Sequence, residues 1–192
     1  MTSPPGSPNS TFDRIRLAAI KTAWLGRRLA FGCKWTPRGV QAAALARKEA
    51  AALKHSCVQE THITIALGHL GDGFAAERLK FLGFQYERSL AQAREILGTG
   101  SVAMESIAIP YSDRAKRVFS LARRLSLRDG LHYFGTDHLF LALLQTPEEL
   151  LKQLLEQKGL ALTEFRTETE ASYREALNHS LLHPGSKPSA QL

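Results

Sequence analysis

The stretch His62-Ile63-Thr64-Ile65-Ala66-Leu67 is answered later in the chain by His138-Leu139-Phe140-Leu141-Ala142-Leu143. Further segments share this offset without a gap: WTPR at 35–38 with YSDR at 111–114, LAR at 45–47 with LAR at 121–123, and Gly83 with Gly159. Self-similarity at one fixed offset is typical of a duplicated structural unit. The sequence therefore predicts two copies of one unit, over 35–98 and 111–177, joined by a linker over 99–110.

Each unit has the pattern of four short helices. In the first unit Thr36 is an N-cap candidate with Pro37 behind it, and the helices are expected to cover 37–54, 62–71, 74–82 and 87–97, with Thr61 capping the second. In the second unit the expected helix starts are Ser112, Asp137, Thr146-Pro147 and Thr163, and the expected ends are Gly130 and Gly159. No segment alternates like a strand. The prediction is an all-α fold of two tandem four-helix repeats related by pseudo-twofold symmetry.

The ends of the chain differ from the repeats. Residues 1–10 are rich in Pro, Ser and Gly and predict a tail, and a second tail is expected over 178–192. Residues 11–32 have an apolar periodicity that predicts an extra N-terminal helix. Residues 1–34 contain six basic side chains and one acidic one. Three readings stay open: a helix packed on the body, a helix that docks on a partner or membrane surface, and a transit segment.

Composition narrows the class of protein. The chain has 192 residues, is 44% hydrophobic and carries a formal net charge of +7, but most of that excess lies in residues 1–34. The nearly balanced body argues against nucleic-acid binding by the repeats. No apolar run reaches the roughly 18 residues of a membrane span. Two cysteines without a CxxC pair favour a reducing compartment, which is the cytoplasm, or an organelle stroma or matrix if 1–34 is a transit segment.

Catalytic and cofactor chemistry finds little support. There is no GxxxxGK[ST] phosphate loop and no GxSxG turn. His62 and His69 are about 10 Å apart along a helix, which is too far to share one metal ion. His62 and His138 are expected instead to bond the backbone at helix starts. Cys33 is expected to be a linker thiol and Cys57 a buried apolar residue. The prediction is a protein that is not an enzyme and holds no cofactor or metal.

The repeated motifs resemble a known family. The segments YFGTDHLFLALL at 133–144, GDGFAA at 71–76 and WTPR at 35–38 are similar to the Clp N-terminal (double Clp, or Clp repeat) domain, over about 35–175. In Clp-type AAA+ unfoldases this domain precedes the ATPase modules, so the chain resembles a stand-alone copy without them. The resemblance implies a non-catalytic, adaptor-like accessory factor. It would dock on Clp protease subunits, a Clp unfoldase, adaptors or substrate proteins.

The resemblance also implies candidate binding residues. In some bacterial relatives the acid before the repeated His, with the Thr of the opening motif, helps to hold phosphorylated arginine. The acid position holds Thr61 in the first unit and Asp137 in the second, so the resemblance favours a site in the second unit, at Asp137 with Ser112. The candidate set for this or another partner is Thr36, Arg38, Ser112, Arg114 and Asp137. The alternative is that Thr61 and Asp137 are only helix N-caps. The alternative function is binding to nucleic acid or a membrane surface through 11–34.

Overall fold

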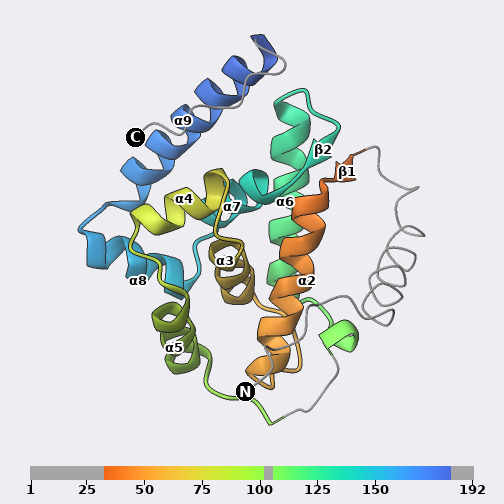
Figure 1. Ribbon diagram of the computed structural model, residues 1–192, viewed down its shortest axis with the longest axis vertical. Helices are drawn as coiled ribbons and strands as arrows, with labels where there is room; N and C mark the ends of the chain where they lie inside the picture. The colour runs from red at the N-terminus through yellow and green to blue at the C-terminus, as the bar shows by residue number, and fades with distance from the viewer. Residues whose placement is uncertain (1–32, 102–105, 183–192) are drawn as a thin grey trace, which may run out of the picture.

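The computed structural model describes residues 33–101 and 106–182 (Figure 1). Eight α-helices fill these ranges, together with two short strands and one 3-10 turn. In chain order they are β1 Lys34–Trp35, α2 Pro37–Ala52, α3 Glu60–His69, α4 Phe74–Phe81, α5 Tyr86–Leu97, η2 Ser106–Ala108, α6 Asp113–Arg128, β2 Tyr133–Phe134, α7 Thr136–Gln145, α8 Glu149–Lys158 and α9 Leu162–Leu182. The all-α prediction is confirmed.

The duplicated sequence becomes a duplicated set of helices. Both ends of α6 are related to the ends of α2 by the offset of the sequence repeat, and α7 stands in the same relation to α3. The start of α9 is related to the start of α5 by this offset too, but α9 is longer, with 21 residues against 12. The additional length is the one large departure from the repeat among these helices.

The opening segment of each repeat pairs with the other repeat. Strand β1, which leads into α2, pairs in parallel with β2, which leads into α7. The equivalent pair is a single parallel bridge between Tyr111 and Val58. The backbone bonds correspond as well, since Thr36 N donates to Phe134 O (2.9 Å) and Ser112 N donates to Val58 O (2.9 Å). Each opening helix therefore starts against the other repeat, as pseudo-twofold symmetry requires. The two-residue strands were not expected from the sequence, because they are too short to show alternation.

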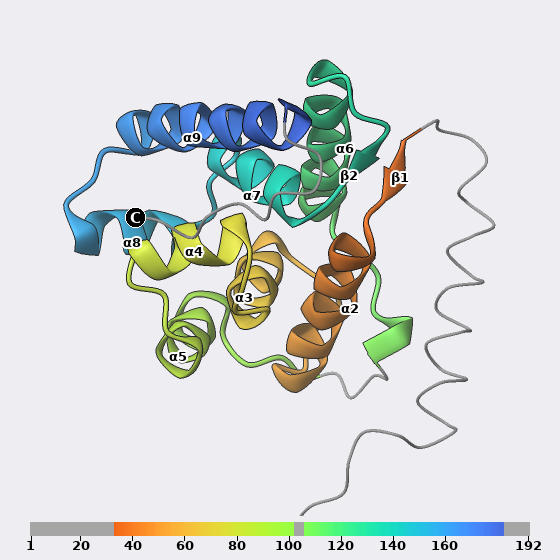
Figure 2. The same cartoon turned by 45° about the horizontal axis from the view of Figure 1, so that its top comes forward.

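Helices α3 and α7 form the centre of the molecule, with the other helices around them (Figure 2). Residues 60–67 of α3 and 138–144 of α7 are all buried. Helix α7 is apolar on nearly every side, and α3 buries polar residues as well, so both helices lie inside the core. The repeated motif that marks the sequence is therefore the shared core of both units.

Aromatic rings join the repeats around the crossed segments. The ring of Trp35 packs against Phe134 (centroids 4.3 Å apart) and against Phe119 (5.2 Å). Tyr111, the repeat equivalent of Trp35, meets the same Phe119 ring edge-on at 4.8 Å. Its hydroxyl donates to Ala43 O (3.0 Å), and burial raises the pKa of Tyr111 to about 12. The core is therefore continuous between the two halves.

The repeated histidines bond helix starts, as the sequence predicted. Gln59 N donates to Nδ1 of His62 at 2.9 Å, and Gly135 N donates to Nδ1 of His138 at 3.4 Å. An accepting Nδ1 leaves the proton of each neutral ring on Nε2. In the first repeat Nε2 of His62 lies 2.9 Å from Nδ1 of His55 and donates to it. The proton of the neutral His55 ring is then on Nε2, which donates to Gly98 O (3.0 Å). In the second repeat Nε2 of His138 lies 2.9 Å from the Tyr173 hydroxyl.

Several predicted caps are wrong. Helix α3 begins after Gln59 and α7 after Gly135, so neither Thr61 nor Asp137 is an N-cap. Helix α8 is capped by the carboxylate of Glu148, which accepts from two backbone amides, rather than by Thr146-Pro147. Caps at Thr36 and Ser112 and the left-handed end at Gly159 are confirmed. Thr61 bonds Glu148, which is 87 residues away and which short-range patterns cannot show, whereas Asp137 accepts from its neighbour Thr136.

The C-terminal segment and the two cysteines differ from the sequence-based expectations. Helix α9 continues to Leu182, so residues 178–182 of the predicted tail are helical. Cys33 is buried and Cys57 is only half-buried, the reverse of the expectation, because Cys33 lies beside Ser126 where β1 crosses to the other repeat. The predicted helix over 11–32, and the nucleic-acid or membrane function assigned to it, lie outside the described residues.

Gly135 provides a test of the crossed junction. A Cβ on Gly135 would overlap Oγ1 of Thr36, the cap of the opening helix of the other repeat. We expect Gly135→Ala to destabilise the protein by about 1–3 kcal/mol, the usual cost of an overpacked core. The free energy of unfolding in urea measures this loss.

Thr36→Ala removes the overlapping atoms, so the double variant should lose less stability than the sum of the two single variants. Strict additivity of the two changes would contradict the close contact between α2 and the start of α7.

The His55–His62 pair predicts sensitivity to acid. Burial, with a smaller contribution from His55, lowers the pKa of His62 to about 4. An unfolded histidine titrates near 6.5, so the unfolded state binds more protons between these values. The contribution of His62 to the free energy of unfolding is therefore fully present above pH 6.5. It falls by about 3 kcal/mol as the pH is lowered towards 4. Urea unfolding at a series of pH values gives the slope.

His62→Gln is the matched control, since glutamine at the third helical position can accept from the Gln59 amide but does not titrate. The slope between pH 6.5 and 4 should shrink in this variant. An unchanged slope would show that His62 is not the group responsible.

Candidate functional site

The candidate residues lie at the two junctions where the repeats cross. At the first junction Thr36 caps α2 by accepting from Gly39 N (3.0 Å), and its own amide bonds Phe134 O just before α7. At the second junction Ser112 caps α6 by accepting from Ala115 N (3.1 Å), and its amide bonds Val58 O just before α3. Each junction thus combines an opening helix of one repeat with the second helix of the other.

This arrangement corrects the pairing of Asp137 with Ser112. Asp137 lies in the first turn of α7, which starts beside Thr36 of the first repeat. Ser112 lies beside the start of α3, where the residue equivalent to Asp137 is Thr61. The candidates therefore separate into Thr36, Arg38 and Asp137 at the first junction, and Ser112 and Arg114 at the second.

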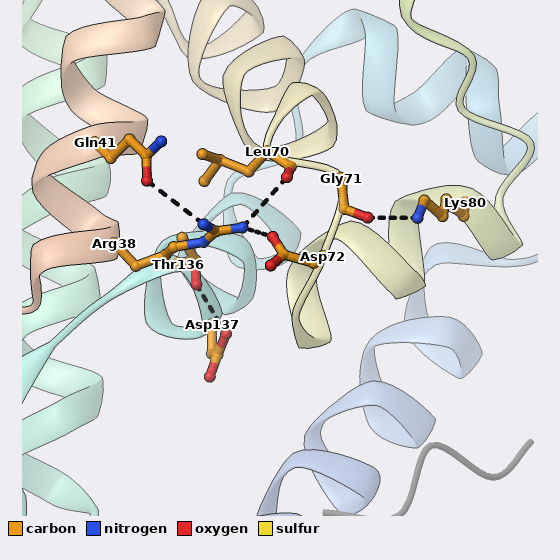
Figure 3. A network of polar contacts seen from close by, with 8 residues as sticks. All are labelled: Arg38, Gln41, Leu70, Gly71, Asp72, Lys80, Thr136 and Asp137. Carbon is orange, nitrogen blue, oxygen red and sulfur yellow. Dashed lines mark hydrogen bonds and ion pairs between the residues drawn. The ribbon is translucent and has the colours of Figure 1, made fainter. Parts of the chain in front are cut away.

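The Arg38 guanidinium contacts three other residues at the first junction (Figure 3). Its Nη2 donates to Leu70 O (3.2 Å) at the end of α3 and forms an ion pair with Asp72. Its Nη1 lies 3.5 Å from Oε1 of Gln41. Asp72 belongs to the turn Gly71-Asp72-Gly73, in which both glycines have positive φ values of 77° and 81°. This turn brings a carboxylate to the guanidinium of the opening helix.

Asp137 offers a carboxylate at the same junction. It is half-buried, and Thr136 Oγ1 donates to its Oδ1 at 3.0 Å. Burial raises the pKa of Asp137, the Thr136 hydrogen bond opposes this shift, and the negative charge of Glu77 adds to it. A carboxylate held in this way favours a cationic partner, because pairing with a guanidinium recovers the solvation that it has lost.

The second junction has a different set of polar contacts. Arg114 Nε pairs with Oε1 of the nearly buried Glu60 at 3.2 Å. Thr61 is itself buried and donates to Glu148 Oε2 at 2.7 Å, so it offers no carboxylate and its hydroxyl is already used. At the position of Asp137 the second junction therefore has no carboxylate, and its two acids, Glu60 and Glu148, are already paired with Arg114 and Thr61.

Glu148 is a polar contact that the sequence interpretation missed. Its two carboxylate oxygens accept from the hydroxyls of Thr61 (2.7 Å) and Thr64 (2.9 Å) and from the amides of Leu150 (2.8 Å) and Leu151 (3.0 Å). Burial raises its pKa even though all four hydrogen bonds favour the charged form. Asp72 and Glu148 occupy equivalent positions of the two repeats, so the repeat offset could have identified both acids together.

A third polar cluster joins α2, α3 and α5. The buried carboxylate of Glu49 accepts from the Tyr86 hydroxyl (3.0 and 3.1 Å), and its Oε1 lies 3.0 Å from Nδ1 of His69. Burial raises the pKa of Tyr86 to about 12, and the charge of Glu49 adds to this shift. Every polar atom in these contacts has a partner within the cluster, so we assign it to the packing of the first repeat.

Within the described parts of the chain, no three His, Cys, Asp or Glu side chains lie close enough to hold a metal ion. Over the same ranges, every helix is too short or too polar to cross a bilayer.

Comparison with known proteins identifies the family. The model of the Clp repeat (R) N-terminal domain matches residues 34–158 and, a second time, residues 110–190. The starts of the two matches are separated by the offset of the internal repeat. The chain belongs to this Clp N-terminal domain family.

Relatives of known name share this region. The "ATP-dependent Clp protease ATP-binding subunit ClpA homolog" of Guillardia theta is 33% identical over 135 residues, which cover 70% of this chain and 16% of that protein. The "Chaperone protein ClpC, chloroplastic" of Pisum sativum is also 33% identical over 135 residues, which cover 70% of this chain and 14% of that protein. The matched region is therefore only a small part of the length of these relatives.

Solved structures share the fold. The N-terminal domain of the caseinolytic protease associated chaperone ClpD from Arabidopsis thaliana matches with a TM-score of 0.58 and 17% identity, over 73% of this chain and 95% of that chain. The Hsp104 N-terminal domain from Candida albicans matches with a TM-score of 0.53 and 16% identity, over 71% of this chain and 89% of that chain. At these identities the likeness is one of fold.

Proposed function

We propose that this protein is a non-catalytic protein-binding module, an adaptor-like accessory factor of the Clp protease-chaperone system. It would dock on Clp protease subunits, on a Clp unfoldase, or on the adaptors and substrates of these proteins. Membership of the Clp N-terminal domain family supports the proposal, since these domains are interaction modules. The relatives named as Clp subunits and chaperones indicate the system in which it would act.

The single observation that carries the proposal is the pair of charges at the first junction. Arg38 and Asp137 come from different repeats, and each lies two residues after one partner of the close approach between Thr36 and Gly135. Figure 3 shows both side chains at this junction. Asp72 already neutralises Arg38, whereas no basic side chain is bonded to Asp137 in the described residues. We propose that Asp137 receives a guanidinium from the partner, with Thr36 and Arg38 beside it. A phosphorylated arginine is one ligand with this group.

The compartment is part of the same proposal. Cys33 and Cys57 are both free thiols, which suits a reducing compartment. Chloroplastic relatives favour an organelle stroma over the cytoplasm if residues 1–34 act as a transit segment. We propose one of these two compartments.

The proposal predicts that Asp137→Asn weakens binding without loss of fold. A lost charge-assisted hydrogen bond costs about 1.5–3 kcal/mol, or roughly a 10- to 150-fold increase in Kd. The measurement is calorimetric titration of the full chain with purified Clp protease and unfoldase subunits from the same genome, and with a peptide that carries one phosphoarginine.

Glu156→Gln is the matched control, because Glu156 is an exposed carboxylate on α8. It should leave each Kd unchanged. Lack of binding by the wild-type chain to any of these subunits would contradict the docking function. Equal Kd values for the wild type and Asp137→Asn would contradict the site.

A further inference from the structure

Helix α6 carries a much larger positive charge than its repeat counterpart α2. Six basic side chains and one acidic one give α6 a net charge of +5, whereas α2 carries three basic residues and one acid. The whole chain has a net charge of +7. Residues 1–34 carry +5 of it and α6 carries another +5, so the residues outside these two segments together carry a net negative charge. The positive charge of the folded body is therefore concentrated on one helix.

Three of the arginines lie in a row on the solvent side of α6. Arg117, Arg124 and Arg128 are exposed and fall within about 40° of one another at 100° per residue, over roughly 16 Å of helix length. The opposite side of the helix packs into the core through Ala115, Val118, Ala122 and Leu125. The equivalent positions on α2 hold Gln41, Lys48 and Ala52, all exposed. The row of arginines is thus specific to the second repeat.

Two of the three arginines in this row make no bonded contact with a carboxylate in the described protein, although the charge of Arg117 acts on Asp113 one turn earlier. Arg114 pairs with Glu60, Lys116 with Asp113, and Arg128 with Asp129. Over residues 33–101 and 106–182, Arg117 and Arg124 form no ion pair and no side-chain hydrogen bond. An exposed arginine fork without a carboxylate can bind a planar anion through two parallel hydrogen bonds.

An exposed apolar side chain adjoins this row at the end of α6. Leu127 is 41% exposed and follows Arg124 by three residues, so the two side chains are neighbours on the helix surface. Tyr133 is excluded from this face, because the bond to its backbone O comes from Ser126, which is buried on the side of α6 opposite to the arginines. Arginine beside an exposed apolar side chain suits a protein-protein interface.

We propose that the α6 face, defined as Arg117, Arg124, Leu127 and Arg128, docks an acidic protein segment that also carries apolar side chains. The carboxylates would meet Arg117 and Arg124, and an apolar side chain would cover Leu127. The ends of this chain do not fit as occupants, since 1–34 is basic and 183–192 contains no acidic residue. The inference deepens the proposed function, on which it rests for the protein nature of the partner.

The test uses the full chain and a fluorescein-labelled peptide of repeated Glu-Glu-Leu-Glu blocks, with binding followed by fluorescence anisotropy. We expect Arg117→Glu/Arg124→Glu to raise the Kd at least tenfold and to remove most of its salt dependence. Leu127→Ser should weaken binding of this peptide but not of an all-glutamate peptide of equal charge. Equal Kd values for the wild type and the double arginine variant would overturn the proposal.

Lys48→Glu/Arg94→Glu is the matched control, since it changes the net charge by the same amount at exposed positions on α2 and α5. It should leave the Kd within about twofold. A loss equal to that of the α6 variant would show only a general charge effect and would overturn the proposal. Tighter binding to an oligo(dT) of equal charge, to anionic vesicles, or to a second copy of the chain would also overturn it.

Titration with the Clp subunits separates this inference from the proposed function. Unchanged binding of a Clp subunit by Arg117→Glu/Arg124→Glu, with peptide binding also unchanged, would reject the α6 face and keep the docking function. Peptide binding through α6 without binding to any Clp subunit would keep the α6 face and reject the docking function.

Discussion

The backbone bonds that cross between the repeats are the constraint on which the rest of the structure depends. Thr36 N bonds Phe134 O, and Ser112 N bonds Val58 O, so each opening helix is positioned by the other repeat. Because the strands are so short, the aromatic contacts of Trp35 and Tyr111 with Phe119 add to the joining of the repeats at this point. The start of each opening helix is bonded to the other repeat, and the body of that helix packs on the second helix of its own repeat.

The crossing decides which side chains can act together. Asp137 and Ser112 are neighbours in the sequence pattern but belong to different junctions. Asp137 shares a junction with Thr36 and Arg38, which lie far away in the chain. The duplication also allowed the junctions to diverge, since the acid of one is replaced by Thr61 in the other. The carboxylate at one junction and the basic helix of the second repeat are the basis for the two different partner surfaces that we propose.

The sequence predicted the helices well because the constant offset between the repeats preserves their apolar pattern, and it predicted the bonds of His62 and His138 because these are local. It failed where the partner is distant in the chain. The local pattern predicts Thr61 as a cap, but its hydroxyl bonds Glu148, 87 residues away. The nearly balanced charge of the whole body does not show the charge of α6, because it mixes the arginines of this helix with the acidic residues of other segments.

The most direct test of the crossed arrangement is native-state hydrogen exchange at the amides of Thr36 and Ser112. Each of these amides donates a bond that joins the repeats, so both should exchange only with the free energy of global unfolding, as the amides of α3 and α7 do. Exchange of either amide at a clearly lower free energy, with the second helix of its own repeat still protected, would show that the repeats open separately and would contradict the account.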